Sequence, residues 1–419
     1  MRVLLTNNTL GPRAGTELYI YDVAVELLKR GHEPVAFSTE LGEVAEQLRA
    51  ATVPVVDDLS RLAVPPDIIH GHHHLDTLIA VLTFPTVPAI NFCHGWSPWE
   101  EQPLLFPSVM GYVAVDHVCR DRLMFENGIP SEQIHVLLNF VDTERFPARP
   151  SLPAAPKRAL AFGNTFLHDA YLAILGTACR ELGISLDAAG AGTGRPLRNP
   201  ETELGEYDLV FAKGRAALEA MAVGCAVILC DARGLGPMVT PEEWDGLRMF
   251  NFGVRTMTLP IDVTNVRSQI RRYDPAGCAA ISARVRSEAT LGGAVDQLIH
   301  LYRDIVQRFP QCSFDPALGQ MAAAHYLRSH AATFKGHAAL LAAAEAREPL
   351  LAAEARESSL AAENALAQAS LTQARYELDC VRNSVTWRLA RSVLENPLLR
   401  FLSPVVKRAG SLIRRKQPS

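Results

Sequence analysis

The chain has 419 residues, of which 48% are hydrophobic and 21% are charged. This balance is that of a globular protein with sizeable cores, and the length allows two ordinary domains with an appendage. The formal net charge of -4 supplies no basic field over the whole chain, so the composition does not favour nucleic acid as a partner.

Eight cysteines are scattered along the chain without a Cys-x-x-Cys pair. This pattern favours free thiols in a reducing compartment over a disulfide framework or a zinc site. The first residues have the pattern of a strand and not of a leader peptide, and no uninterrupted apolar stretch is long enough to span a bilayer. We therefore expect a cytoplasmic protein.

Residues 1–150 alternate short apolar runs with helical patterns, which predicts a parallel sheet covered on both faces. A helix is expected over residues 18–28, because its apolar residues recur on one face, with Gly31 at its C-terminal cap. The predicted strands are 3–5, 35–37, 67–70, 89–92, 112–115 and 135–137. We expect a first Rossmann-like domain here.

Prolines in residues 147–156 predict a stiff linker, after which the alternation restarts. Residues 157–308 are therefore expected to form a second Rossmann-like domain, followed by a helical connector over 309–337. The predicted strands are 159–162, 186–189, 209–211 and 226–230, and the predicted helices lie around 170–182, 216–223 and 294–306. Two such domains place a cleft where the carboxyl ends of their strands converge.

Beyond residue 337 the composition shifts to Ala, Glu, Leu and Arg. Two apolar columns with a seven-residue repeat predict a coiled coil over 350–385, within an Ala/Glu-rich helix at 338–386. Glu357 and Asn364 weaken one column and Pro349 interrupts its start. Homo-oligomerisation and a lone helix packed on the body therefore both stay open.

Residues 387–419 combine apolar side chains, with Trp387 as an aromatic anchor, and many cations, among which Glu395 is the lone acid. A basic amphipathic stretch of this kind favours a helix lying on an anionic membrane surface. The alternative is a solvated terminus that docks on the body.

Two strand-to-helix turns carry residue types suited to phosphate groups. The first, over residues 11–17, contains Gly15 and Thr16, and such a turn presents backbone N–H groups and a helix N-terminus. In the second, Lys213 and Arg215 flank Gly214 at a predicted helix start, as a pyrophosphate site requires. Glu219 lies one turn further on, where a carboxylate can accept both ribose hydroxyls; the alternative is an acid on the helix surface.

The run ALEAMAVGCAVI, residues 217–228, resembles the donor-site signature of glycosyltransferase family 4 and its relatives with the GT-B fold. Four more segments resemble parts of the same family in the right order, over about residues 1–308. They are AGTELYIYDVAVELLKRGHE, DIIHGHH, CHGW and LLNFVDTERF. The resemblance implies two Rossmann-like domains, α/β throughout, and a nucleotide-diphosphate sugar as co-substrate with no further cofactor.

The resemblance also implies roles for single residues. Glu219 would hold the donor ribose, and Gly15, with Thr16 beside it, would let the first loop approach the donor phosphates. His94 would lie in the cleft as a catalytic residue, near the transferred sugar or the acceptor hydroxyl; the alternative is a hydrogen-bonded structural histidine. Gly163 and Asn164 follow the first strand of the second domain and are assigned to the donor site.

The sequence departs from the family pattern at the donor site. Phe211 stands where the first acid of the E-x7-E pattern belongs, and the usual Arg/Lys pair is missing, leaving Asn164 and His168. We therefore expect Lys213 and Arg215 to replace the missing cations as a pyrophosphate clamp.

The chain contains no D-x-D motif, and His72, His73 and His74 form a run that suggests metal ligation. Consecutive strand residues point to opposite faces, so we expect these histidines at a rim and no metal site. The charge on the leaving diphosphate would then be met by cations and helix N-terminal amides, without a metal.

These observations predict a metal-independent glycosyltransferase of the hexosyltransferase type, bound peripherally to the inner face of the cell membrane. It would extend a lipid-linked or growing saccharide, as in lipopolysaccharide or other surface polysaccharide biosynthesis. The segment NSVTWRLARSVLENPLLR resembles the ends of such assembly proteins. Two alternatives stay open: a nucleotide-sugar epimerase on the same fold, and a degenerate scaffold, which the loss of the acid at Phe211 favours.

Overall fold

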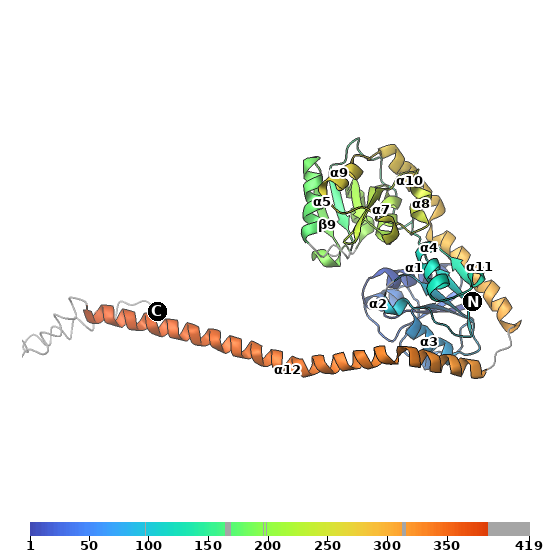
Figure 1. The fold of residues 1–419 in the computed structure, drawn as a ribbon, viewed down its shortest axis with the longest axis horizontal. Coiled ribbons are helices and arrows are strands. Elements are labelled where there is room, and N and C mark those ends of the chain that lie inside the picture. The colour runs from blue at the N-terminus through green and yellow to red at the C-terminus, as the bar shows by residue number, and fades with distance from the viewer. Residues whose placement is uncertain (97, 164–168, 196, 198, 312–315, 384–419) are drawn as a thin grey trace, which may run out of the picture. The chain divides into compact units, whose positions relative to one another are not determined.

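The computed structural model describes residues 1–96, 98–163, 169–195, 197, 199–311 and 316–383. Met1–Tyr326 form one compact unit that contains two sheets, one parallel and one mostly parallel, with their helices, and a second unit begins at Leu327. The predicted fold class, α/β with two Rossmann-like domains and a helical C-terminal region, is confirmed (Figure 1).

The first sheet has seven parallel strands in the order β3-β2-β1-β4-β5-β6-β7. The strands are β1 (Arg2–Thr6), β2 (Glu33–Phe37), β3 (Val55–Val56), β4 (Ile68–His72), β5 (Ala89–Cys93), β6 (Val109–Ala114) and β7 (Ile134–Val136). This is the doubly wound order, whose direction of winding reverses between β1 and β4. The sequence missed β3, because two residues are too few to show a period.

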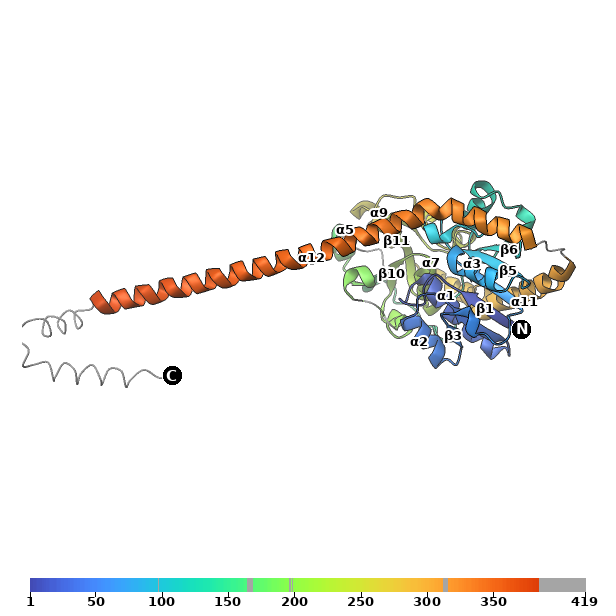
Figure 2. The ribbon, with the colours of Figure 1, turned by 90° about the horizontal axis from the view of Figure 1, so that it is seen from below.

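Helices of the first domain are α1 (Gly15–Lys29), α2 (Glu43–Ala50), α3 (His74–Thr83) and α4 (His117–Asp121). Figure 2 shows α1 and α3 with strands β1, β5 and β6 of this sheet. The face of α1 that packs into the core consists of Tyr19, Ile20, Val23, Ala24 and Leu27. The helix ends at Arg30, and Gly31 follows with φ +75°, the left-handed conformation expected after a helix C-terminus.

The second sheet has five strands in the order β12-β11-β10-β8-β9. The strands are β8 (Arg158–Phe162), β9 (Ser185–Ala189), β10 (Leu209–Ala212), β11 (Ala226–Asp231) and β12 (Gly234–Met238). All pairs are parallel except β11 with β12, and the order reverses between β8 and β10. The sequence missed β12, whose glycines and proline are atypical of a strand.

Helices of the second domain cover both faces of this sheet. They are α5 (Asp169–Glu181), α6 (Pro200–Glu203), α7 (Gly214–Val223), α8 (Trp244–Arg248), α9 (Val263–Ile270) and α10 (Pro275–Glu288). One apolar cluster includes α7 residues with Trp244 and Phe252, and another includes Leu175, Phe211 and Val266.

The next helix, α11 (Leu291–Arg308), corrects the expected domain boundary at residue 308. Its apolar face, which includes Val295, Leu298 and Tyr302, belongs to the core of the first domain. Arg30 of the first domain also donates a hydrogen bond to the carbonyl of Gly292 at 2.9 Å. The chain therefore returns to the first domain after α10, and a strict split of the sequence into 1–150 and 157–308 is wrong at this helix.

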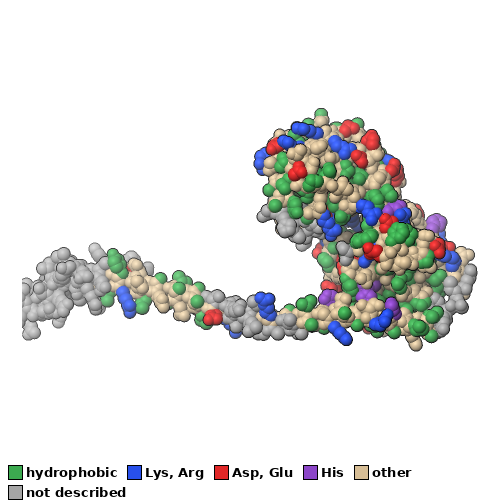
Figure 3. Space-filling view, viewed as in Figure 1, with side chains coloured by type: hydrophobic (Ala, Val, Ile, Leu, Met, Phe, Trp, Pro, Cys, Tyr) green, Lys and Arg blue, Asp and Glu red, His purple; other side chains and the backbone are tan. Residues whose placement is uncertain are grey.

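The last described helix, α12 (Pro316–Asn383), runs through most of the expected connector, 309–337, and continues through Pro349. Among the described residues, no helix combines the length and apolar character needed to cross a membrane. On α12, Leu360, Leu371 and Leu378 from the predicted columns are exposed, and Figure 3 shows hydrophobic side chains on the surface of this helix. Residues 387–419, predicted to lie on a membrane, are outside the described residues.

Candidate functional site

Each sheet has one pair of strands between which the direction of winding reverses. In doubly wound folds, ligands bind beyond the carboxyl ends of such strands. In the first sheet the winding reverses between β1 and β4, so the loop before α1 and His72 lie at its switch point. In the second sheet it reverses between β8 and β10, so Gly163 and Lys213 follow the equivalent ends. The predicted residues Gly15, Gly163 and Lys213 thus follow switch-point strands.

At the N-terminus of α1, Gly15 is exposed, and a Cβ added there would meet no atom within 4 Å. Ala14, the N-cap residue, makes no side-chain capping hydrogen bond. The Thr16 hydroxyl donates to Glu17 at 3.1 Å, and burial raises the pKa of that carboxyl. The structure therefore leaves open space at Gly15, while its phosphate-approach role and that of Thr16 stay predictions.

Between β10 and α7 the loop is a single residue, Lys213. Gly214 has φ +56°, a conformation that favours glycine, and its N–H donates to the carbonyl of Phe252 at 3.1 Å. The ammonium group of Lys213 forms an ion pair with Asp231, which is buried at the end of β11. Lys213 is thus placed at the helix start as predicted, with its charge already neutralised.

Arg215 connects the two domains. Its guanidinium contacts the Asp22 carboxylate of α1 at 2.5 Å and the Glu219 carboxylate, one turn along α7, at 2.8 Å. Burial alone would lower the pKa of Arg215, but the two carboxylates together raise it. Burial also raises the pKa of Glu219, and Arg215 offsets part of that rise. Glu219 is buried and paired, so ribose binding by this residue stays a prediction.

Phe211 lies inside β10 and is fully buried in the apolar core. Because the strand runs to Ala212, the position eight residues before Glu219 is part of the sheet and not of a loop. The side chain at this position therefore packs in the apolar core and does not contact a ligand. After β8, the N–H of Gly163 donates to the carbonyl of Ala189 at 3.0 Å, and Asn164 and His168 are outside the described residues.

His94 follows β5 at the edge of a group of rings. Its Nε2 lies 3.4 Å from Nε2 of His72, and its backbone N–H donates to Glu101 at 2.7 Å. The ring of Tyr19 contacts it edge-on, with centroids 4.9 Å apart. Burial lowers the pKa of His94 to about 4, so the ring is neutral near neutral pH. The catalytic role of His94 stays a prediction.

The sequence suggested that the run of three histidines lies at a rim, but the structure shows these residues buried. His72 ends β4, His73 precedes α3 with φ +61°, and His74 begins α3; all three are buried. The positive φ of His73 turns the chain inward, so the alternation expected of a strand does not apply. In the part of the chain that the structure describes, no group of His, Cys, Asp or Glu side chains has the arrangement of a metal site.

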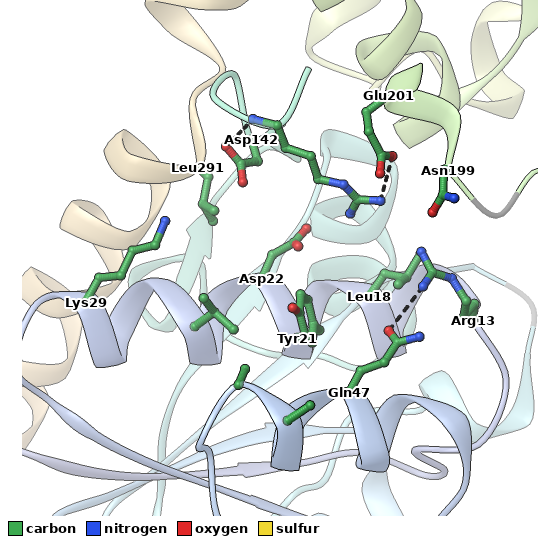
Figure 4. A pocket seen from close by; sticks show the side chains of 14 residues that line it. Arg13, Leu18, Tyr21, Asp22, Lys29, Gln47, Asp142, Asn199, Glu201 and Leu291 are labelled. Atoms are coloured by element: carbon green, nitrogen blue, oxygen red, sulfur yellow. Dashed lines mark hydrogen bonds and ion pairs between the residues drawn. The ribbon is translucent and has the colours of Figure 1, made fainter. Parts of the chain in front are cut away.

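A cavity of about 520 Å³ lies between the two domains, next to the Arg215 contact. Its lining residues are Arg13, Leu18, Tyr21, Asp22, Val25, Lys29, Gln47, Ala50, Ala51, Asp142, Arg145, Asn199, Glu201 and Leu291. Figure 4 shows the contact between Arg13 and Gln47, both of the first domain. The Arg145 guanidinium donates to Glu201 at 2.8 Å. Acids, amides and an aromatic ring around one cavity suit a polar, hydroxyl-rich ligand.

The sequence predicted a cleft between the two domains, but it did not identify the residues that line this cavity or the acids that hold the cations. Asp22 lines the cavity and also pairs with Arg215, so it joins the cavity to the predicted donor residues. Asp22 and Asp231 lie in elements that the sequence predicted, but neither position has a motif of its own. The signal available for Asp22 was that it is an acid, like Glu17, among the mostly apolar buried residues of α1.

Comparison with known proteins supports the resemblance to glycosyltransferase family 4. Residues 13–145 match the family model of Glycosyltransferase Family 4. No curated protein sequence gives a significant match.

Several solved structures are similar in fold. A glycosyltransferase from Rickettsia africae superposes with a TM-score of 0.55 at 14% identity, over 73% of this chain and 98% of that one. HepE from Anabaena, solved with UDP and glucose, gives 0.51 at 14% identity over 72% and 99%. Sucrose-phosphate synthase from Thermosynechococcus elongatus gives 0.50 at 13% identity over 73% and 98%. At these identities the likeness shows the fold.

The protein belongs to the class with a glycosyltransferase-like GT-B fold. This follows from the topology of its two sheets, from their switch points and from these superpositions. Within that class the resemblance to glycosyltransferase family 4 is confirmed, and its match lies in the first domain, over residues 13–145.

Proposed function

We propose that the protein is a glycosyltransferase that takes a sugar from a nucleotide-diphosphate sugar. The observation that carries this proposal is Arg215, a half-buried cation at the start of α7, beside a switch point of the second sheet and in contact with α1 of the first domain. The UDP and glucose named for the Anabaena protein of similar fold support a donor of this class.

Sugar transfer builds negative charge on the departing nucleoside diphosphate. In this proposal Lys213, Arg215 and helix N-terminal amides meet that charge without a metal. Because Arg215 is held by Asp22 and Glu219, a diphosphate has to compete with these carboxylates for the guanidinium. Closure of the domains would then exclude water, so that the acceptor attacks the sugar.

Replacement of the two proposed clamp residues tests the donor site. The double variant Lys213→Ala, Arg215→Ala should lose at least tenfold in affinity for a UDP-, GDP- or dTDP-sugar, as measured by calorimetry. Arg284→Ala is the matched control, since Arg284 of α10 pairs with Asp245 of α8 and with Glu288 of its own helix in the same domain. An unchanged donor affinity in the double variant rejects the clamp.

For the acceptor, we propose a saccharide that is growing or linked to a lipid. Support comes from the polar lining of the interdomain cavity and from the basic amphipathic composition of residues 387–419. The full chain should bind vesicles of an anionic phospholipid, and a chain ending at residue 383 should not. Equal binding by the full chain and the shortened chain would contradict the proposed peripheral location on the inner face of the membrane.

We also propose that residues 350–385 associate two or more copies of the chain. The exposed leucines Leu360, Leu371 and Leu378 of the predicted seam support this, because exposed apolar columns gain by mutual burial. Light scattering should report an oligomer that becomes a monomer when the three leucines are replaced by glutamate. If the wild-type chain is a monomer, the proposed association is wrong and the alternative of a lone helix holds.

A second candidate is a scaffold that binds a nucleotide but does not turn it over. The buried Phe211 and the pairing of Glu219 with Arg215 favour it, because both positions lack a carboxylate free for a sugar or ribose. Assays of transfer and hydrolysis with the sugar-nucleotide panel separate the two. Turnover with any donor supports the transferase, whereas binding without turnover in the presence of membrane extract supports the scaffold.

A further inference from the structure

The interdomain cavity has a cation without an acid partner at one end. Arg13, in the loop before α1, lines the cavity, and its guanidinium donates to the amide oxygen of Gln47 of α2 at 3.2 Å. Figure 4 shows this pair at one end of the cavity, Lys29 toward the other end and Tyr21 between them. Within the described residues, the contact with Gln47 is the sole hydrogen bond of the Arg13 guanidinium, which forms no ion pair there.

Two other guanidinium groups at the domain interface are neutralised. Arg145 donates to the carboxylate of Glu201, and Arg215 contacts the carboxylates of Asp22 and Glu219. An amide oxygen carries only a partial negative charge, so a contact with an amide holds a guanidinium in place without cancelling its charge. The end of the cavity next to α2 is therefore positive.

The three carboxylates that line the cavity already have donors of their own. Asp22 and Glu201 are in the ion pairs described above, and Asp142 accepts the backbone N–H groups of the second and third residues after it, at 3.0 and 3.2 Å. Figure 4 shows Asp142 away from Arg13, at the other side of the cavity. The guanidinium of Arg13 has several N–H groups, of which the described residues occupy one, so the others remain for a ligand.

These N–H groups suit a carboxylate on a sugar. A guanidinium binds a carboxylate through two parallel N–H···O contacts, a pairing stronger than a hydrogen bond between neutral groups. Next to this end, Tyr21 supplies an aromatic ring and Asn199 an amide, which suit the ring and hydroxyls of a saccharide. The volume of about 520 Å³ is within the range of small-ligand sites, roughly 300–1,000 Å³.

We propose that the interdomain cavity binds an acidic saccharide, whose carboxylate pairs with Arg13 and whose sugar ring lies beside Tyr21. Gln47 holds the guanidinium for this contact. The role of the saccharide as the acceptor rests on the proposed function, whereas its binding in the cavity does not.

A nucleotide diphosphate is another source of anionic oxygens. Its proposed clamp, Lys213 and Arg215, lies at the start of α7, whereas the Arg13 guanidinium is held on α2 by Gln47. We therefore assign Arg13 to the saccharide. The affinity for UDP should then be the same in Arg13→Gln as in the wild type, and a loss of about tenfold would assign this cation to the donor and overturn the proposal.

Calorimetry of the full chain with two matched probes tests the saccharide site. One probe is a tetrasaccharide that contains glucuronic acid, and the other is the same tetrasaccharide with its carboxyl groups reduced to alcohols. The wild type should bind the acidic probe about tenfold more tightly or better, as expected for a charged hydrogen bond. Equal affinity for the two probes, or binding of neither, would overturn the proposal.

Substitutions at Arg13 identify the group responsible. Arg13→Gln should bind the acidic probe no more tightly than the reduced one. Arg13→Lys should retain part of the preference, because an ammonium group keeps the charge but not the paired N–H geometry. Arg49→Gln is the matched control and should keep the full preference, since this exposed arginine of α2 pairs with Glu46. A preference that survives in Arg13→Gln would show that another group binds the carboxylate.

An assay of sugar transfer separates this inference from the proposed function. If the acidic probe binds as expected and no transfer occurs with any donor, the proposed function fails and the saccharide site stands. If transfer occurs and the two probes bind equally, the saccharide site is wrong and the proposed function stands.

Discussion

At the scale of single residues, the candidate site is a set of charges that neutralise one another. Arg215 is held by Asp22 and Glu219, and Lys213 is held by Asp231. A buried charge left without a partner is costly, so these acids are needed for stability while they also compete with an anionic ligand. This charge balance therefore opposes the binding of an anionic ligand.

Replacing Asp22 should change stability and ligand affinity in opposite directions. Asp22→Asn removes the interdomain acid and should lower the free energy of unfolding by about 1–3 kcal/mol, because a charged hydrogen bond is lost. The same change frees Arg215 and should tighten UDP binding several-fold. Urea unfolding and calorimetry measure the two effects.

Asp296→Asn is the control, since that acid pairs with Arg30 at an exposed position and should change stability by less than about 1 kcal/mol. Weaker UDP binding by Asp22→Asn would contradict the competition described here.

At the scale of elements, the ends of β4 and β5 carry the buried histidines, and the junction of β10 with α7 carries the cations. The sequence predicted most of these elements because strand and helix periods are local. It also predicted that Lys213, Gly214 and Arg215 begin a helix. It could not predict the Asp22–Arg215 pair, whose partners are 193 residues apart, nor the inward turn at His73.

The buried histidines predict a loss of stability in mild acid. Their folded-state pKa values are lowered, to about 4 for His94, whereas unfolded histidine has a pKa of about 6.5. The unfolded chain therefore binds more protons below pH 6.5, and the free energy of unfolding falls as pH falls. Between pH 7.5 and 6 the three histidines should together cost about 2 kcal/mol, as measured by urea unfolding.

Carboxyls whose pKa is raised by burial, such as Glu17, Glu219 and Asp76, oppose this effect at lower pH. Burial raises the pKa of Asp76 to about 6, which stabilises the folded state as pH falls further. Asp76→Asn removes that contribution and should leave the loss above pH 6 in place. Constant stability between pH 7.5 and 6 would show that the histidines are protonated equally in both states.

At the scale of the whole molecule, the two domains are joined by more than the linker. Helix α11 returns to the first domain, and Asn251 of the second domain donates to the carbonyl of Val115 and accepts from the N–H of Asn139 at 3.0 Å. Asn251 is buried and has φ +49°. Sequence periodicity identified α11 as a helix but not the core it joins, because an amphipathic face does not specify its partner.

Two substitutions at Asn251 separate its backbone from its side chain. Asn251→Gly loses the interdomain hydrogen bonds but adopts the left-handed conformation without strain. Asn251→Ala loses the same hydrogen bonds and is also strained in that conformation. The alanine variant should be less stable than the glycine variant by about 1–2 kcal/mol, the cost of this conformation for a residue with a Cβ. Both should melt below the wild type in calorimetry, and equal stability of the two variants would mean that the loop changes conformation.

The junction of β10 and α7 sets how the site can move. The junction consists of Lys213 alone. It therefore cannot move as a flexible loop to bring the Arg215 guanidinium to a ligand. Because Arg215 already contacts Asp22 of α1, any change in the distance between the backbone of α7 and the first domain has to come from rotation of one sheet and its helices against the other. The rate at which the site opens and closes is therefore a property of the hinge segments and not of the residues that bind.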